Sequence, residues 1–305
     1  MKILLTGASG YIGKKILPVL VSNGFEVVCC VRDQSRFIPP DSVEGKIDII
    51  EADLLKKETL SRIPNDINIA FYLVHSMSSS KNFERMELES AANFKEAISG
   101  TDCHQVIYLS GIVNEEMLSD HLSSRLAVEK ELAKGSFHLS TLRAGIIVGS
   151  GSASFEIIRD LVEKLPVMVA PKWLETRCQP IAVADAITYL VGAINNTDIY
   201  DKSFDIGGPD ILTYKEMLLE FARRRKLKRR IFVVPVMTPR LSSYWLYFVT
   251  STSYKLATAL VDSMKVEVVC SDDKIKEFIK AQDLSYTQAV DLALEQVEMN
   301  DIISS

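Results

Sequence analysis

The chain has 305 residues, enough for one large α/β domain with a small appendage. Hydrophobic residues make up 47% of it and charged residues 25%, which is the composition of an ordinary globular protein rather than a disordered one. The formal net charge of −5 excludes a general attraction to nucleic acid or to an anionic membrane, so we expect no nucleic-acid partner.

The five cysteines indicate neither a disulfide framework nor a metal site. None stands in a C-x-x-C pair or in a Cys/His cluster of metal-binding spacing, so we expect reduced thiols and no bound metal. A strand pattern begins at the first residues with no apolar secretory leader, so we expect a cytoplasmic protein. The longest charge-free apolar stretch, Leu241–Tyr254, is too short to cross a bilayer, and we expect no transmembrane segment. The role of the apolar residues 231–265 stays open between packing on the protein and contact with an interface.

The most informative stretch is residues 1–13. An apolar strand, Lys2–Thr6, leads into glycines at positions 7, 10 and 13, and a helical pattern follows over Tyr11–Val21. This strand–turn–helix context is typical of a dinucleotide site. In such a turn Gly7 permits the tight bend, Gly10 lets a pyrophosphate approach the backbone, and Gly13 lets the helix pack against the sheet. The phosphates are then expected to face the N–H groups at the start of the helix.

Strand and helix patterns alternate through the first half of the chain. The expected strands are Lys2–Thr6, Glu26–Val31, Ile47–Glu51, Ile69–Val74, Gln105–Ser110 and His138–Leu142. The expected helices are Tyr11–Val21, a short one near Lys57–Ile63, Asn82–Ser99 and Leu122–Ala133. This alternation predicts an α/β fold with a Rossmann-type, doubly wound parallel sheet over residues 1–150, and ligands at the carboxyl ends of its strands.

Beyond Gly149 the pattern changes, but no linker rich in proline, glycine or serine marks a separate domain. The expected elements are the helix Ser154–Lys164, the strand Val167–Ala170, the helix Val183–Ile194, the strand Ser203–Ile206 and a helix after Thr213. Thr213 and Glu216 carry the signature of a capping box at that last helix. We therefore expect residues 151–305 to form a small substrate-side α/β subdomain interleaved with the core. The basic run Arg223–Arg230 straddles the end of the last helix, and we interpret it as solvated structural charge rather than a nucleic-acid patch.

Several motifs taken together resemble an extended or atypical short-chain dehydrogenase/reductase. They are Thr6–Gly13 (TGASGYIG), Asp53–Leu54 after the third strand, Gln179–Asp185 and Phe204–Pro209, so the similarity runs nearly end to end. Within that superfamily the chain is most similar to the NAD(P)-binding NmrA-like group, through Tyr72–Met77, His121–Arg125 and Val234–Trp245.

The resemblance implies which residues hold the cofactor. It places the pyrophosphate on Gly7, Ser9, Gly10, Tyr11, Ile12 and Gly13, the adenine beside Asp53 and Leu54, and the cofactor ribose between Val74 and His75. Ala144 and Gly145 fall where the superfamily often has a Pro-Gly pair next to the nicotinamide. His75 is equally compatible with an ordinary polar residue of a loop.

The tip of the second strand bears on the choice of cofactor. The 2′ position of the adenosine ribose is expected there, where an acidic side chain binds two hydroxyls and an arginine fits a phosphate. Arg32 comes first, 19 residues after Gly13, so we expect NADP. Asp33 directly after it leaves NAD open, and Arg32 as a surface charge of the following loop is the alternative.

Reductases of this superfamily normally use a Tyr-x-x-x-Lys pair, in which the lysine lowers the pKa of the tyrosine that donates the proton. In the matching window of this chain, His121 replaces the tyrosine and Arg125 replaces the lysine. A histidine can donate a proton near neutral pH, whereas an arginine can hold ribose hydroxyls and supply charge but does not deprotonate usefully. Ser110 is the candidate for the helper hydroxyl, although Gly111 fits that position at least as well.

Three functional hypotheses follow. An NADP-dependent oxidoreductase acting on an unidentified carbonyl or enone is favoured by the polar residues Arg177 and Gln179, bordered by Trp173, which suggest a substrate pocket. A dinucleotide-binding sensor or assembly protein with little chemistry is favoured by the loss of the Tyr/Lys pair. An epimerase or other sugar-nucleotide enzyme follows from the extended architecture alone. The expected partner is a small-molecule substrate or effector, and the sequence fixes neither its identity nor the oligomeric state.

Overall fold

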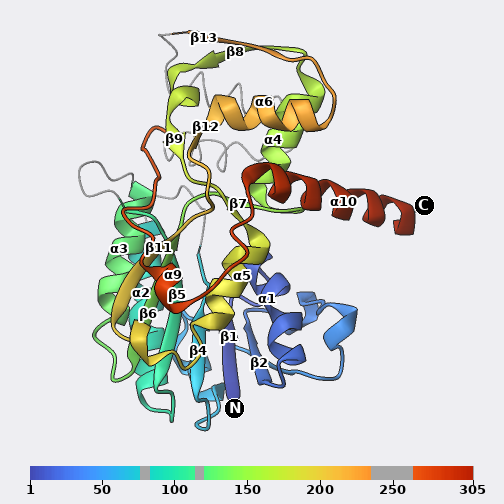
Figure 1. Cartoon of the computed structure of the whole chain (residues 1–305). Coiled ribbons are helices and arrows are strands. Elements are labelled where there is room, and N and C mark those ends of the chain that lie inside the picture. The colour runs from blue at the N-terminus through green and yellow to red at the C-terminus, as the bar shows by residue number, and fades with distance from the viewer. Residues whose placement is uncertain (76–82, 114–119, 235–263, 305) are drawn as a thin grey trace.

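Our computed structural model describes residues 1–75, 83–113, 120–234 and 264–304, with the side chains at 83, 120–122 and 300–304 excepted. At its centre is a sheet of seven parallel strands in the order β3-β2-β1-β4-β5-β6-β11 (Figure 1). These strands are β1 Lys2–Thr6, β2 Glu26–Val31, β3 Asp48–Glu51, β4 Ile69–Tyr72, β5 Gln105–Gly111, β6 His138–Ala144 and β11 Lys202–Ile206. The strand order reverses between β1 and β4, which makes that point the topological switch of a doubly wound fold. The predicted fold class is therefore confirmed.

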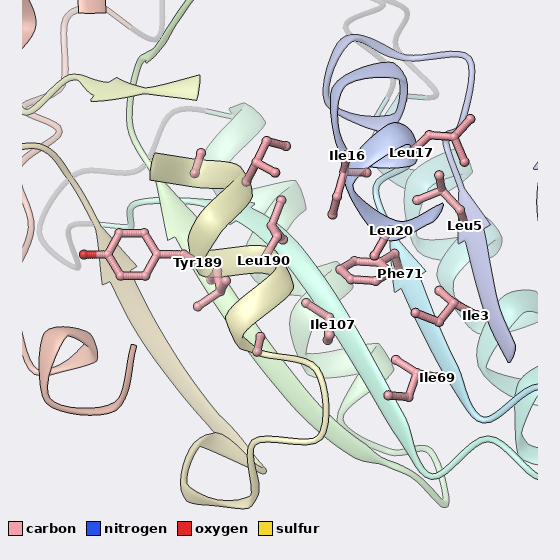
Figure 2. Close-up of a cluster of buried hydrophobic side chains, with 14 of the residues drawn as sticks. Ile3, Leu5, Ile16, Leu17, Leu20, Ile69, Phe71, Ile107, Tyr189 and Leu190 are labelled. Carbon is pink, nitrogen blue, oxygen red and sulfur yellow. The ribbon is translucent and has the colours of Figure 1, made fainter. Parts of the chain in front are cut away.

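Helices cover both faces of this sheet. On one face, α1 (Tyr11–Ser22) packs beside α5 (Val183–Gly192), and the other face carries α2 (Phe83–Ser99) and α3 (Asp120–Leu132). Figure 2 shows how the first face is filled: apolar side chains of α1 and α5 point onto the strands. The labelled ones are Ile16, Leu17 and Leu20 from α1, Leu190 from α5, and Ile3, Leu5, Ile69, Phe71 and Ile107 from the sheet, whereas the Tyr189 ring of α5 points away from these strands. Burial of such side chains stabilises the fold by about 1.5–3 kcal/mol each, which anchors the switch point firmly.

A second hydrophobic core lies beyond the carboxyl end of the sheet. It joins α4 (Ala153–Lys164), α6 (Tyr214–Arg224) and α10 (Tyr286–Ser304) to β8 (Val167–Pro171), which pairs in parallel with β13 (Arg230–Val234). The predicted capping box at α6 is present: Thr213 Oγ1 accepts from the Glu216 amide, and the Glu216 carboxylate accepts from the Thr213 amide at 2.7 Å. The second half is nevertheless tied to the first, because β11 is a strand of the central sheet.

Three contacts made by the basic run Arg223–Arg230 agree with its interpretation as charge that supports the structure. The Arg224 guanidinium pairs with Asp291 of α10 at 2.5 and 2.6 Å, and Arg225 pairs with Glu163 of α4 at 3.1 Å. Arg229 Nε donates to the carbonyl of Val162, also in α4. The run thus pins α6 to its two neighbouring helices.

Several short elements and one long helix, α10, were not expected from the sequence. They are the strands β7 Ile147–Val148, β9 Arg177–Cys178, β10 Ile181–Ala182 and β12 Leu212–Thr213, the 3₁₀ turns η1 Gln34–Arg36, η2 Asp41–Val43, η4 Lys172–Glu175 and η5 Thr197–Ile199, and the helices α9 Ile275–Phe278 and α10. The short helix expected near Lys57–Ile63 is a 3₁₀ helix, η3 Lys57–Arg62.

Within the described residues, no helix has the length and apolar character needed to span a membrane. The stretch Leu241–Tyr254 lies outside the described residues.

Candidate functional site

A cleft of about 770 Å³ opens at the carboxyl ends of β1, β2 and β4, over the switch point of the sheet. Its floor is the first glycine turn, with Thr6, Gly7, Ser9 and Gly10. One end is bordered by the segments that follow β2 and β3, and the other by the segment that follows β4 together with α2, β5 and α3. Ligands of doubly wound sheets bind in this position, and the volume is in the range of small-molecule sites.

The glycine turn has the geometry that a bound pyrophosphate requires. Gly7 has φ +73°, and a Cβ added to it would lie 2.6 Å from the Leu73 carbonyl oxygen. A Cβ on Gly13 would lie 2.2 Å from the Gly7 oxygen, so only glycine lets α1 pack this close to β1. Gly10 is the N-cap of α1 and no side chain of the described residues caps this helix, which leaves its first-turn amides for an anionic ligand. The turn therefore fits a dinucleotide.

Tyr11 and Ile12 are part of this turn, but their side chains do not line the cleft. The Tyr11 ring lies against Gly149 and Gly151, and burial raises the pKa of its phenol to about 12, with a smaller contribution from the charge of Glu156. Ile12 packs against the core between α1 and the sheet. Tyr11 and Ile12 can therefore contact a ligand in the cleft only through their backbone atoms.

Two arginines face the end of the cleft beyond β2. Arg32 and Arg36 both line it and are exposed, and neither guanidinium makes a hydrogen bond or salt bridge with a described residue. Asp33 also lines the cleft, but it caps η1: its Oδ1 accepts from the Ser35 amide at 3.0 Å and from the Ser35 hydroxyl at 2.6 Å. The Ser35 hydroxyl is the main cause of the lowered pKa of Asp33, and the Arg36 charge adds to it. Arg36 was missed in the sequence because only the turn η1 brings it back to the cleft.

The segment after β3 forms the adjoining wall. Asp53 and Leu54 both line the cleft, as the resemblance implied for an adenine site. Leu54 is buried, and its carbonyl accepts from the Asn93 side chain at 2.8 Å. Asp53 Oδ1 accepts from the Leu55 amide at 3.1 Å, which fixes the turn.

The opposite end of the cleft contains a hydrogen-bonded cluster of three side chains. His75, which follows β4 and lines the cleft with Val74, places Nδ1 2.7 Å from Glu87 Oε1 on α2. Ser124 of α3 donates its hydroxyl proton to the other oxygen of Glu87 at 2.5 Å. Glu87 and Ser124 are only 8% and 3% exposed, so this carboxylate is buried and held from two sides. Neither Glu87 nor Ser124 was singled out as a functional residue from the sequence, because their contact depends on how α2 and α3 pack together.

The residues of the His121–Glu129 window are placed as follows. The His121 side chain lies outside the described set. Arg125 is half-buried on α3, where its carbonyl accepts from the Tyr108 hydroxyl at 3.4 Å. Burial raises the pKa of Tyr108 to about 12, although the Arg125 charge partly offsets it. Ser110 is buried in β5, and neither Ser110 nor Arg125 is among the residues that line the cleft.

The remaining sequence candidates lie outside this cleft. Gln179 bridges two segments: its Nε2 donates to the Gly208 carbonyl at 2.8 Å, and its Oε1 accepts from the Cys270 amide at 3.0 Å. Arg177 makes a two-point ion pair with Glu267 at 2.7 and 3.0 Å. Trp173 is 9% exposed and packs edge-to-face on Tyr214 in the second core.

Ala144 is the last residue of β6, and Gly145 follows it. Ala144 is buried, and a Cβ on Gly145 would come within 3.1 Å of the Val268 side chain. Gly145 therefore lies against Val268, whose segment forms a β-bridge with Cys178.

Comparison with known proteins gives matches of two kinds. Residues 7–138 match a family described as NAD(P)H-binding. Among curated proteins, the divinyl chlorophyllide a 8-vinyl-reductase of Cucumis sativus is 25% identical over 223 residues, which cover 68% of this chain and 52% of that protein. The GDP-6-deoxy-D-talose 4-dehydrogenase of Aggregatibacter actinomycetemcomitans is 30% identical over 128 residues, 41% of this chain and 42% of that protein. This chain spans about half the length of these relatives.

Solved structures match over the full length. The UDP-glucose 4-epimerase of Thermotoga maritima, solved with UDP-glucose, superposes with a TM-score of 0.76 at 14% identity, covering 98% of this chain and 99% of that one. The UDP-glucuronic acid 4-epimerase of Bacillus cereus, solved with UDP-glucuronic acid and NAD, gives 0.72 at 16% identity, covering 98% and 100%. At such identities the likeness shows the fold alone. Residues 7–138 thus match an NAD(P)H-binding family, and the chain shares its fold with these nucleotide-sugar epimerases.

Proposed function

We propose that this protein is an NADP(H)-dependent reductase that acts on a carbonyl or on an electron-poor carbon–carbon double bond. The observation that carries the proposal is the cleft itself: a complete glycine turn with two exposed arginines at one end. The similarity to a vinyl reductase supports a double bond conjugated to an electron-withdrawing group as one acceptor class.

The preference for NADP(H) rests on charge at the end of the cleft beyond β2. Arg32 and Arg36 line the region where the 2′ position of the adenosine ribose is expected, and a guanidinium can bind a phosphate through two parallel hydrogen bonds. Asp33, which would favour NAD, already uses Oδ1 to cap η1. The two arginine side chains, together with an Asp33 carboxylate that already accepts hydrogen bonds, favour NADP(H) over NAD(H).

The bound cofactor supplies the hydride, and the protein supplies placement and a proton. Gly7, Ser9 and Gly10 hold the phosphates, Asp53 and Leu54 border the adenine, and Val74 borders the ribose. On the sequence resemblance, His121 is one candidate proton donor, Arg125 a ribose and charge clamp, and Ser110 a helper hydroxyl. By the same resemblance, Ala144 and Gly145 flank the nicotinamide, while Trp173, Arg177 and Gln179 remain candidates for the substrate side.

Two alternatives differ in chemistry rather than in fold. A sensor or assembly protein that binds NADP(H) without turnover is favoured by the replacement of the Tyr/Lys pair with His121 and Arg125. An epimerase-like activity is suggested by the names of the structural neighbours, whose identity of 14–16% supports only the fold.

Replacing Arg32 and Arg36 separately with alanine tests the cofactor assignment. A hydrogen bond to a charged group is worth about 1.5–3 kcal/mol, so each change should weaken NADPH binding by roughly tenfold or more while NADH binding stays within about twofold. Arg223→Ala is the matched control, because Arg223 is an exposed arginine of α6 paired with Glu220. Tighter binding of NADH than of NADPH by the parent, or equal loss of both in the Arg32 and Arg36 variants, contradicts the assignment.

A further inference from the structure

We infer that the two-stranded sheet of β8 and β13, called the ribbon below, is a docking surface for a membrane that carries anionic lipids. Docking there does not depend on the proposed reductase function, because none of the residues Val167–Pro171 and Arg230–Val234 lines the cleft. The ribbon lies at the top of Figure 1, at the end of the molecule opposite the N-terminus, with α4 and α6 below it.

The outer face of the ribbon is apolar and exposed. Successive side chains of a strand point to opposite faces, so Val167 and Val169 of β8 face outward, whereas Met168 and Ala170 are buried in the second core. Strand β13 pairs in parallel with β8 and sets Phe232 beside Val169. Val167, Val169 and Phe232 are 52%, 49% and 55% exposed. Adjacent exposed apolar side chains of this kind mark an interaction surface.

Basic side chains border this apolar face. Arg230 is the register partner of Val167. Lys226 and Lys228 belong to the segment that leads from α6 into β13, and Lys172 begins η4 at the end of β8. All four basic residues are exposed, and none of their side chains makes a hydrogen bond or ion pair with a described residue. Their charges are therefore available to an external partner.

The basic run Arg223–Arg230 thus contains two kinds of residue. Arg224, Arg225 and Arg229 bond to α10 and α4 and support the structure. Lys228 and Arg230 alternate with Arg229 along the chain and face solvent instead. The structural role of the run therefore accounts for only part of its charge.

The net charge of −5 for the whole chain does not prevent a local attraction at the ribbon. Salt screens charges that lie more than about 8 Å apart at physiological ionic strength, so a membrane in contact with the ribbon responds mainly to the groups beside it. Of the acidic residues that flank β8 in the sequence, Glu163 is paired with Arg225 at 3.1 Å, and Glu175 is the last residue of η4. The border of the ribbon is positive on balance.

An apolar face with a basic border matches the interfacial region of an anionic bilayer. Apolar side chains enter the boundary between headgroups and acyl chains, while lysine and arginine stay among the anionic headgroups. A nucleic acid would attract the same cations and stack a base on Phe232, but it offers nothing apolar to the two valines. The combination therefore favours a membrane over a nucleic acid.

The experiment is flotation of the full-length chain with vesicles of phosphatidylcholine, with and without about one-third phosphatidylglycerol. We expect binding to the mixed vesicles that weakens as salt is raised, and much weaker binding to phosphatidylcholine alone. Lys228→Glu combined with Arg230→Glu should lower partition onto the mixed vesicles by roughly 25-fold or more, because each basic residue near an anionic surface contributes roughly fivefold. Lys56→Glu combined with Lys130→Glu is the matched control, because it changes the net charge equally at two exposed lysines outside the ribbon.

Phe232→Ala tests the apolar part of the surface. Loss of a half-exposed phenyl ring should weaken binding to the mixed vesicles by roughly fivefold while the salt dependence stays the same. Leu88→Ala is the control, because Leu88 is an exposed apolar residue of α2. Urea unfolding midpoints that match the parent verify that each variant is folded.

Absence of binding to the mixed vesicles overturns the inference, and so does an equal loss of binding in the Lys56/Lys130 control pair. A parent that binds a single-stranded oligonucleotide but no vesicle assigns the basic border to nucleic acid instead. A parent that sediments as a dimer, and becomes a monomer in Phe232→Ala, assigns the apolar face to a second copy of the chain and also overturns the inference.

Discussion

At the residue scale, the three glycines of the first turn have different tasks that the structure separates. Gly13 is required by packing, because a Cβ there would sit 2.2 Å from the Gly7 oxygen and 2.8 Å from the Ala8 Cα. Gly10 has an ordinary φ of −76° and lies at the floor of the cleft; among the described residues, a Cβ there would meet only the Gly7 oxygen, at 3.1 Å. Gly13 is therefore required by the packing of α1 on β1, whereas Gly10 leaves the floor of the cleft open.

This separation predicts opposite phenotypes for two alanine substitutions. Gly13→Ala should lower the free energy of unfolding by about 1–3 kcal/mol through overpacking. Gly10→Ala should change stability by less than about 1 kcal/mol but weaken NADPH binding, because the methyl group blocks the approach of the phosphates. Urea unfolding and calorimetric titration measure the two effects, with Gly100→Ala, whose Cβ would make an ordinary contact of 3.5 Å, as the control. Equal loss of stability in the two variants would refute the division of tasks.

At the element scale, local signals in the sequence were sufficient for most boundaries. The observed bounds of β1 and β2 are the predicted ones, to the residue. Each strand is a short apolar run that ends at a turn or bend of the chain. The capping box placed the start of α6 correctly. Helix α10 was missed although Ser285 and Gln288 form a second capping box at its start: the Ser285 amide donates to Gln288 Oε1 at 2.8 Å, and the Gln288 amide donates to Ser285 Oγ at 3.2 Å. The burial of Tyr286, Ala289 and Val290 in the second core fixes the place of the helix.

The cap of α6 provides a quantitative test at this scale. Thr213→Ala removes both the acceptor for the Glu216 amide and the hydroxyl that donates to the Glu216 carboxylate at 2.8 Å. We expect a loss of about 0.5–2 kcal/mol in the free energy of unfolding, the usual cost of deleting such a cap. Thr188→Ala, which removes a hydroxyl bonded to the Ala184 carbonyl inside α5, should cost less because it leaves no helix end unsatisfied. Urea midpoints that are the same for both variants would show that the capping box contributes nothing.

At the scale of the whole molecule, Asp185 and Asp205 hold the C-terminal part of the chain against the central sheet and its helices. Both belong to the motifs through which the sequence resembles a dehydrogenase. The carboxylate of Asp185, 2% exposed, accepts from the Gln282 and Leu284 amides at 3.0 and 2.8 Å. Asp205 of β11 accepts from the amide and hydroxyl of Ser271 at 2.8 and 2.7 Å. The Asp205 bonds join the segment before α10 to β11 of the central sheet, and the Asp185 bonds join it to α5, so the second half of the chain is held to the core at several points.

How the whole chain folds also determines which residues of the candidate site could be predicted from the sequence. The glycine turn, Arg32, Asp53, Leu54, Val74 and His75 follow strand ends that local patterns locate, and all of them line or form the cleft. Arg36 depends on the turn η1, and the bond between Glu87 and Ser124 depends on the packing of α2 against α3. Such contacts between distant residues have no signature in a single sequence.

The most direct test of the account is calorimetric titration of the full-length chain with NADPH and with NADH. We expect one binding site per chain, with NADPH bound tighter than NADH by roughly tenfold or more if Arg32 and Arg36 bind the 2′-phosphate. Absence of binding heat for both cofactors at millimolar concentration, or a preference for NADH, would contradict it.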